Sequence, residues 1–443
     1  MGRQPNSGRG VVPGSRRPGR FPLSVGANKR FQTASGVPDF MLVYTAWDLL
    51  INLTQAEIAQ VIATIKSLGF TGVLVEVPEH YFTINSAPQN VNGDVPFTTP
   101  GDFSTPNAAY WAHVDAGMAK LAAADLAVWV EPGYMGYNAG PEGWYANGMV
   151  SSGATKLQNY GAFFAGRYQA LQNLIWVAGG DFTPSETALF SAMVTGLQSA
   201  SNPKRLITAH WSGSDTTPYA TALQPDAPLP NWDLQAIYTW ASEPSAIIAA
   251  AGSSIKGIIE WHYDHYGSIT IFETTAAAWA SYLGGCAWHT HGDENTWPFG
   301  ATGFGTSTNW AAYVNYIGAQ AMSILKGILM ALNWSALTPD ASHVFVTAGY
   351  GSAGTPGYVP VAATLDGNGK ATSLVAHVPN ANTAITVDKS KIAGAFTAVW
   401  RDPYDGSTVS IGTGIAASGS ANYSRATANS QGGTNWVWVG TVP

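Results

Sequence analysis

Two acidic residues each come directly after a short apolar run. Asp181 follows the run Leu174–Ala178 and a pair of glycines, and Glu260 ends the run Ile255–Glu260. Such runs are typical of buried parallel strands, and enzymes built on parallel barrels or sheets keep their chemistry at the carboxyl ends of those strands. Acetal hydrolysis needs one carboxyl group to protonate the leaving oxygen and a second one as nucleophile or base. We therefore predict glycoside hydrolysis with Asp181 as acid/base and Glu260 as nucleophile; the alternative for this pair is structural salt bridging.

The elements that would position these acids alternate between apolar strands and helices. A capping box at Thr54 and Glu57 marks the first long helix. Eight strands alternating with helices predict an α/β fold, a (β/α)8 TIM barrel over residues 39–336. A doubly wound sheet is the competing architecture, but Thr45–Asp48 is not the Gly-rich phosphate loop expected after its first strand. The expected strands are Phe40–Tyr44, Gly72–Glu79, Leu126–Glu131, Leu174–Ala178, Arg205–Trp211, Leu234–Trp240, Gly257–Glu260 and Tyr282–Trp288.

Aromatic and polar side chains follow these strands, where the rim of a barrel binds substrate. Flat rings stack on sugar faces, and rim carboxylates and imidazoles bind hydroxyl groups, although core packing is the alternative for any single aromatic residue. We expect substrate contacts from Trp47, Glu79, His80, Glu131, Tyr134, Tyr137, Asn138, His210, Tyr238, His262, Tyr263, Trp288, His291 and Trp297.

Metal and serine chemistry receive weaker support. His289, His291 and Asp293 could form part of a metal site, but their spacing matches no strong zinc pattern. No Gly-x-Ser-x-Gly motif is present, which argues against a serine esterase. We predict no metal and no cofactor.

Residues 1–38 form a separate basic zone. Among Gly, Pro and Ser they carry Arg3, Arg9, Arg16, Arg17, Arg20, Lys29 and Arg30, with no acid before Asp39. The zone lacks the apolar core of a secretory signal, and the pair at positions 16–17 only weakly resembles a twin-arginine signal. We expect an extended arm that docks on a protein assembly, and the alternative is a floppy terminus.

After position 337 the pattern changes to short strands separated by turns. Asp366-Gly-Asn-Gly369 is a strong hairpin signal, and the last strand is expected at Trp436–Val439. Residues 337–443 therefore predict an all-β sandwich domain.

Composition limits the classes of partner. The chain has 443 residues, 46% of them hydrophobic and only 11% charged, with a net charge of −7. That charge argues against a nucleic-acid partner. No apolar stretch reaches the roughly 18 residues of a membrane span, and the single Cys286 cannot form an internal disulfide. Few ions and many small polar residues are common in extracellular or particle-associated proteins, and we expect that location.

Several segments occur in the order found in the apiosidase-like glycoside hydrolases, which the chain resembles over roughly residues 40–335. They are Thr45–Asp48, Leu53–Ala56, Lys66–Gly72, Pro96–Asn107, Ile175–Asp181, Ile259–Tyr263 and Gly292–Trp297. The resemblance implies a (β/α)8 catalytic domain with catalytic acids at Asp181 and Glu260. It departs at Asp264, where the family often carries Glu. The C-terminal part, with Val399–Gly406, resembles the β-sandwich often appended to that family and labelled collagen-binding.

The expected function is hydrolysis of plant or bacterial surface polysaccharide by a two-carboxylate mechanism, with retention favoured. The alternative is a non-catalytic glycan-binding or structural component of a particle, such as a phage tail or virion surface. A metal-dependent hydrolase is a third hypothesis, which insensitivity to chelators would exclude.

Overall fold

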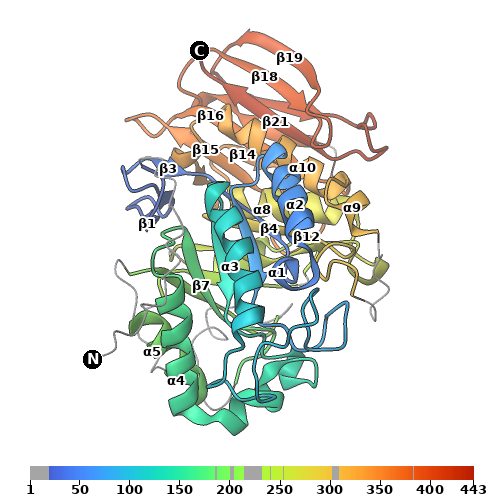
Figure 1. The fold of residues 1–443 in the computed structure, drawn as a ribbon. Coiled ribbons are helices and arrows are strands. Elements are labelled where there is room, and N and C mark those ends of the chain that lie inside the picture. The colour runs from blue at the N-terminus through green and yellow to red at the C-terminus, as the bar shows by residue number, and fades with distance from the viewer. Residues whose placement is uncertain are drawn as a thin grey trace, which may run out of the picture.

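A computed structural model describes residues 19–184, 187–199, 204–213, 232–239, 241–252, 254–301, 309–382 and 384–443. A parallel barrel occupies the first part of the chain, and β-sheets of the second part pack at one side of it (Figure 1). Residues 1–18, which include four of the seven cations of the expected arm, lie outside the described residues.

The barrel is built from eight parallel strands in the order β8-β7-β6-β5-β4-β12-β10-β9. Hydrogen bonds from the amides of Asp233 and Leu234 to the carbonyl of Ile207 link its two edge strands, so the barrel is nearly closed. This confirms the (β/α)8 prediction. The strands are β4 (Met41–Thr45), β5 (Gly72–Glu76), β6 (Ala127–Glu131), β7 (Leu174–Gly179), β8 (Leu206–His210), β9 (Gln235–Tyr238), β10 (Lys256–Glu260) and β12 (Trp288–Asp293).

Helices surround the barrel, and the longer ones bury apolar residues in the core. The predicted capping box at Thr54 and Glu57 begins α2, and a second one at Thr270 and Glu273 begins α8. In the described part of the chain, no helix has both the length and the apolar character needed to cross a membrane. The helices are α1 (Leu49–Asn52), α2 (Gln55–Ser67), α3 (Ala108–Ala123), α4 (Val150–Arg167), α5 (Ala188–Ser199), α7 (Ser245–Ala250), α8 (Ile271–Leu283), α9 (Trp310–Tyr313) and α10 (Ile317–Met330).

A small three-stranded sheet covers the end of the barrel where the strands begin. It consists of β1 (Ser24–Val25), β2 (Phe31–Gln32) and β3 (Pro38–Asp39). The ring of Phe31 is fully buried and meets Trp129 and Trp288 edge-on, with centroids 6.0 Å away in both cases. These contacts make the sheet part of the barrel's hydrophobic core.

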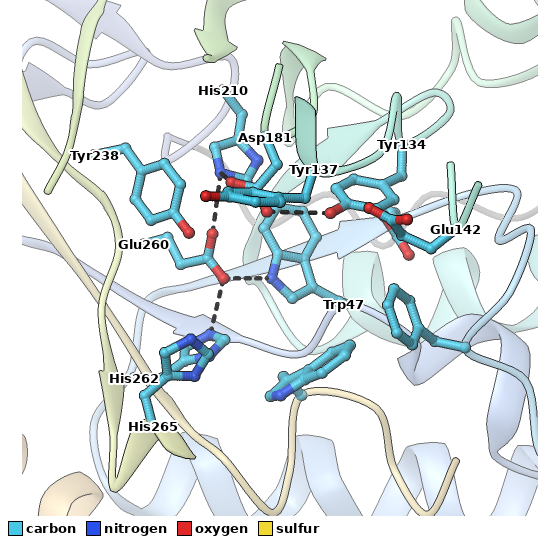
Figure 2. A pocket seen from close by; sticks show the side chains of 13 residues that line it. Trp47, Tyr134, Tyr137, Glu142, Asp181, His210, Tyr238, Glu260, His262 and His265 are labelled. Carbon is cyan, nitrogen blue, oxygen red and sulfur yellow. Dashed lines mark hydrogen bonds and ion pairs between the residues drawn. The ribbon is translucent and has the colours of Figure 1, made fainter. Parts of the chain in front are cut away.

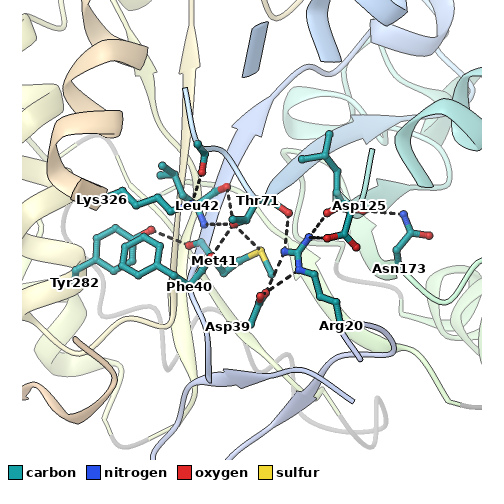
Figure 3. A network of polar contacts seen from close by, with 12 residues as sticks. Arg20, Asp39, Phe40, Met41, Leu42, Thr71, Asp125, Asn173, Tyr282 and Lys326 are labelled. Carbon is teal, nitrogen blue, oxygen red and sulfur yellow. Dashed lines mark hydrogen bonds and ion pairs between the residues drawn. The ribbon is translucent and has the colours of Figure 1, made fainter. Parts of the chain in front are cut away.

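Two arginines of the expected basic arm hold this sheet in place. Arg20 pairs with Asp39 at 3.1 Å and donates to the carbonyls of Thr71, at 2.9 Å, and Asp125 (Figure 3). The buried Arg30 donates to the carbonyls of residues 285 and 286, at 2.9 and 2.7 Å. The sequence assigns residues 1–38 to an arm, whereas residues 19–38 pack on the barrel, because their cations find carboxylate and carbonyl partners there.

The C-terminal part forms two antiparallel sheets around their own core, as the sequence predicts. The expected hairpin at 366–369 joins β15 to β16, with the amide of Gly369 donating to Asp366. The larger sheet has the order β13 (Thr338–Pro339), β15 (Val361–Leu365), β16 (Ala371–Val378), β21 (Trp436–Thr441), β18 (Phe396–Arg401) and β19 (Thr408–Ile415), and the smaller one β14 (Val346–Ala348), β17 (Ala384–Asp388) and β20 (Ser420–Ser424).

Candidate functional site

A cavity of about 530 Å³ opens at the carboxyl ends of the barrel strands. Figure 2 shows both predicted catalytic acids facing it, Asp181 from the segment after β7 and Glu260 from the end of β10. The cavity is lined by Trp47, Glu76, Phe82, Tyr134, Tyr137, Glu142, Asp181, His210, Tyr238, Glu260, His262, His265 and Trp297.

The two acids lie close together beside His210. One carboxylate oxygen of each acid and one nitrogen of His210 all lie within 4.8 Å of one another. Asp181 has a left-handed backbone with φ of 50°, directly after Gly180 with φ of 117°. A Cβ atom at Gly180 would lie 2.3 Å from the Oε1 atom of Glu131, so only glycine lets the chain pass this carboxylate and turn Asp181 into the cavity.

The loop between β6 and α4 holds Asp181 in place. The Tyr134 hydroxyl donates to its Oδ2 atom at 3.1 Å, and the amide of Asn138 donates to its backbone carbonyl at 3.1 Å. Burial raises the pKa of Asp181 to about 6, assisted by the charge of Glu260 and opposed by His210 and by hydrogen bonds from tyrosine. Asp181 can therefore hold a proton near neutral pH, as a general acid must.

The carboxylate of Glu260 has three polar neighbours. Trp47 donates through Nε1 at 3.0 Å, and the Nε2 atoms of His210 and His262 lie 3.0 and 3.2 Å away. Burial alone would raise its pKa, but these three neighbours together outweigh burial and lower the pKa to about 2. His262 reaches this position because β11 (His262–Tyr263) runs beside Gly292, where a side chain would collide with the His262 ring.

His210 links Glu260 to a second carboxylate behind the cavity wall. Its Nδ1 atom lies 3.4 Å from Glu131, which is fully buried at the end of β6. Burial would lower the pKa of His210, but Glu131, Glu260 and Asp181 raise it well above its ordinary value. The imidazole also stacks on Trp47 with an interplanar angle of 11° and meets Tyr238 edge-on. His210 is thus held by two ring contacts and by carboxylates at both nitrogens.

Half of the predicted substrate-binding residues line this cavity, and half do not. Trp47, Tyr134, Tyr137, His210, Tyr238, His262 and Trp297 line it. Glu131 and Asn138 do not line the cavity but contact residues that do. Glu131 lies beside His210, and the amide of Asn138 donates to the backbone carbonyl of Asp181. Three others do not line the cavity. Glu79 accepts hydrogen bonds from the amides of Tyr81 and Phe82, His80 packs edge-on against Trp144, and Tyr263 packs against Tyr316.

The placement of Trp288 and His291 corrects the sequence reading. The expected eighth strand ends at Trp288, whereas β12 begins there, paired with Met41 and Gly257 at the starts of their strands. Trp288 therefore packs against Phe31 at the opposite end of the barrel. His291 is fully buried beside Gly318 of α10, because alternate strand residues face the helices. Neither residue lines the cavity.

Four lining residues fall outside the predicted set: Glu76, Phe82, Glu142 and His265. Glu76 ends an apolar run as Glu260 does, so the same signal could have found it. Phe82 and Glu142 belong to long loops, and His265 to a 3-10 turn (His265–Gly267), where no periodicity indicates which side chains face inward.

Three side-chain groups of the described residues have donor atoms close enough to share an ion. They are Asp181, His210 and Glu260; His262, His265 and Glu294; and Asp48, Glu76 and Glu79. The His289–His291 segment, considered from the sequence, belongs to none of them, because His289 faces Ser281 of α8. The expected absence of a metal stays a prediction.

Known proteins provide an independent comparison. The crystal structure of a glycoside hydrolase family 5 protein from Bacteroides vulgatus ATCC 8482 matches with a TM-score of 0.77 and 19% identity, over 95% of this chain and 93% of that one. A second solved structure, described as a glycoside hydrolase, matches with a TM-score of 0.73 and 19% identity, over 95% of this chain and 96% of that one. These two likenesses show the shared fold. Among curated proteins, none matches the sequence.

The family model for the apiosidase-like catalytic domain matches residues 26–336, more than half of the chain. The matched range begins inside the small sheet that packs on the barrel and ends before the β-sandwich. This chain therefore belongs to the apiosidase-like family and is a glycoside hydrolase.

Proposed function

We propose that the cavity hydrolyses glycosidic bonds with retention of configuration, using Asp181 as acid/base and Glu260 as nucleophile. The observation that carries this proposal is the approach of the two acids, with carboxylate oxygens within 4.8 Å of each other. Carboxyl groups about 5–5.5 Å apart are typical of retaining enzymes, whereas inverting enzymes leave about 6.5–9.5 Å for a water molecule.

In the first step the Glu260 carboxylate attacks the anomeric carbon while Asp181 gives its proton to the leaving oxygen. The bond between that carbon and the leaving oxygen breaks, and a covalent glycosyl-enzyme forms. In the second step Asp181 takes a proton from water, and the water oxygen attacks the anomeric carbon from the face that the leaving group occupied. The bond to Glu260, on the opposite face, breaks. The sugar leaves with its original configuration, and both acids return to their starting states.

The opposite pKa shifts of the two acids support these roles. Burial raises the pKa of Asp181 to about 6, so a useful fraction is protonated at mildly acidic pH. Burial would have the same effect on Glu260, but the contacts with His262, His210 and Trp47 lower its pKa to about 2. Paired carboxyl groups with separated pKa values are the usual basis for dividing acid and nucleophile roles.

A polysaccharide of plant or bacterial surfaces is the proposed substrate class. The exposed Tyr137 and the partly exposed Trp297 offer ring faces in a cavity that also holds hydroxyl-binding imidazoles. Such a substrate implies work outside the cell or on a particle surface, which is part of the proposal.

Asp181→Asn and Glu260→Gln test the proposal on a panel of aryl glycosides and surface polysaccharides. Glu260→Gln should abolish release from every substrate. Asp181→Asn should lower the rate of sugar release from polysaccharide roughly 10²–10⁴-fold. The rate on aryl glycosides should fall less, because their leaving groups need little protonation. Asp366→Asn, in the hairpin of the sandwich, serves as the control. Wild-type protein that binds glycans without releasing sugar would favour the non-catalytic alternative.

A further inference from the structure

Three tyrosines cluster outside the cavity, and none of them lines it. They are Tyr263 of β11, Tyr313 at the end of α9 and Tyr316 directly before α10. The centroid of the Tyr316 ring lies 5.9 Å from that of Tyr263 and 5.2 Å from that of Tyr313, with interplanar angles of 38° and 56°. We call these three side chains the tyrosine platform.

Close packing of α10 on the strands brings the rings together. A Cβ atom at Gly318 would lie 2.6 Å from the Cε1 atom of His291 and 3.3 Å from the Cβ atom of Tyr263, so a larger residue would push the start of α10 away from β11 and β12. The amide of Tyr316 donates to the carbonyl of Tyr313 at 3.0 Å, which fixes the turn between α9 and α10. The platform therefore stands on a backbone that is held from both sides.

The platform is open to solvent and is surrounded by amides rather than by basic groups. Tyr316 is 43% exposed, and the other two tyrosines are partly exposed. Residues 295–325 contain no Asp, Glu, Lys or Arg. The side chain of Gln320 donates to the carbonyl of Asn315 at 2.9 Å, and both residues are exposed beside the rings. Such a surface offers flat apolar faces together with hydrogen-bonding groups.

The platform lies at the same face of the barrel as the cavity. The two residues of β11 face opposite sides, so that His262 lines the cavity and Tyr263 meets Tyr316. From there α10 runs back toward the other end of the barrel, where Lys326 donates to the carbonyl of Gly69 before β5. The start of α10, with Tyr316, is therefore next to the rim that carries the proposed catalytic acids.

Resting on the proposed function, we propose that the tyrosine platform binds sugar units of the polysaccharide that lie beyond those held in the cavity. The C–H face of a sugar ring packs on an aromatic ring, and its hydroxyl groups bond to amides and phenols at the edge. A chain long enough to reach both places gains affinity, because the second contact is made by a ligand that is already tethered. The platform does not reach the reacting atoms and acts on binding alone.

Tyr316→Ala, assayed on a long and a short substrate, tests this inference. On the plant or bacterial polysaccharide that the wild-type enzyme degrades fastest, KM should rise about three- to tenfold while kcat stays unchanged. On an aryl glycoside with one sugar unit, which ends in the cavity, neither constant should change. Tyr313→Ala should show the same dependence on substrate length. An equal change on both substrates, or an unchanged KM on the polysaccharide in both variants, would overturn the inference.

Two further variants separate ring stacking from other effects. Tyr316→Phe keeps the ring and should retain most of the affinity for polysaccharide. Met330→Ala removes an apolar side chain that is 50% exposed at the opposite end of α10, and it should leave KM unchanged on both substrates. A dimer in solution that Tyr316→Ala disrupts, with unchanged polysaccharide binding, would assign the platform to contact between copies of the chain and overturn the inference.

Binding to inactive protein distinguishes failure of the inference from failure of the proposed hydrolysis. Affinity electrophoresis in gels that contain plant cell-wall or bacterial capsular polysaccharide compares Glu260→Gln with the double variant that also carries Tyr316→Ala. We expect weaker retardation of the double variant by the same three- to tenfold factor in affinity. That result, combined with wild-type protein that releases no sugar, would keep the platform and remove the hydrolysis. Sugar release by wild-type protein without any effect of Tyr316→Ala would do the reverse.

Discussion

The Nε2 atom of His210 lies 3.0 Å from a carboxylate oxygen of Glu260. The other nitrogen of the ring faces the buried Glu131, and the ring face is stacked on Trp47. An imidazole enclosed in this way cannot turn aside, and as a cation it balances two carboxylates at once. His210 is therefore a positioning residue that keeps the proposed nucleophile oriented and ionised.

Replacing His210 with Asn should move the acidic limb of the pH profile. The contact with His210 is one of those that lower the pKa of Glu260 to about 2 against the effect of burial. Without it we expect that pKa to rise toward the ordinary value of about 4.3 or above. As the pH is lowered, kcat/KM should therefore begin to decrease at a higher pH in the variant than in the wild-type enzyme. His80→Asn, which removes an imidazole that packs on Trp144, should not move the limb. An unchanged acidic limb in His210→Asn would contradict the role given to this residue.

The alkaline limb should report on Asp181. This acid must be protonated to act, so kcat/KM should fall as the pH rises through its pKa of about 6. The hydrogen bond from Tyr134 stabilises the ionised form. Tyr134→Phe should therefore raise the pKa and shift the limb to higher pH. Tyr137→Phe is the matched control, because it removes a hydroxyl at the same wall. A shift toward lower pH in Tyr134→Phe would show that the sign is wrong.

The small N-terminal sheet should contribute to the stability of the barrel. Phe31 is fully buried against Trp129 and Trp288, so Phe31→Ala should lower the free energy of unfolding by about 3–5 kcal/mol. Val37→Ala, in the same sheet segment at 58% exposure, should change it by less than about 0.5 kcal/mol. Urea unfolding measures both. Equal effects for the two variants would mean that residues 19–38 are not part of the barrel core.

The barrel and its acid pair could be predicted from the sequence because both depend on local patterns. Asp181 follows an apolar run and Glu260 ends one, runs of this kind are typical of buried strands, and parallel strands bring their carboxyl ends to one face. The position of a side chain along the barrel axis could not be predicted in this way. Trp288 lies in an apolar stretch whose strand could begin or end there, and only pairing with Met41 and Gly257 decides.

Long-range partners account for the remaining differences. The composition of residues 1–38 indicates an arm, but the charges of Arg20 and Arg30 meet Asp39 and backbone carbonyls far along the chain. Glu142 reaches the cavity from a loop whose path depends on close packing between Gly136 and Gly143. No local pattern encodes such contacts. Docking of the arm on an assembly and the extracellular or particle-associated location stay predictions.

The nucleophile itself can be identified by mass spectrometry. The sugar released most readily in the substrate panel is converted to an activated 2-deoxy-2-fluoro glycoside, which slows hydrolysis of a covalent glycosyl-enzyme so that it accumulates. Peptide mapping should find one sugar on the peptide that carries Glu260, and none in the Glu260→Gln protein. A sugar attached to Asp181 or to another carboxylate, or an inverted product formed without any adduct, would contradict the assignment.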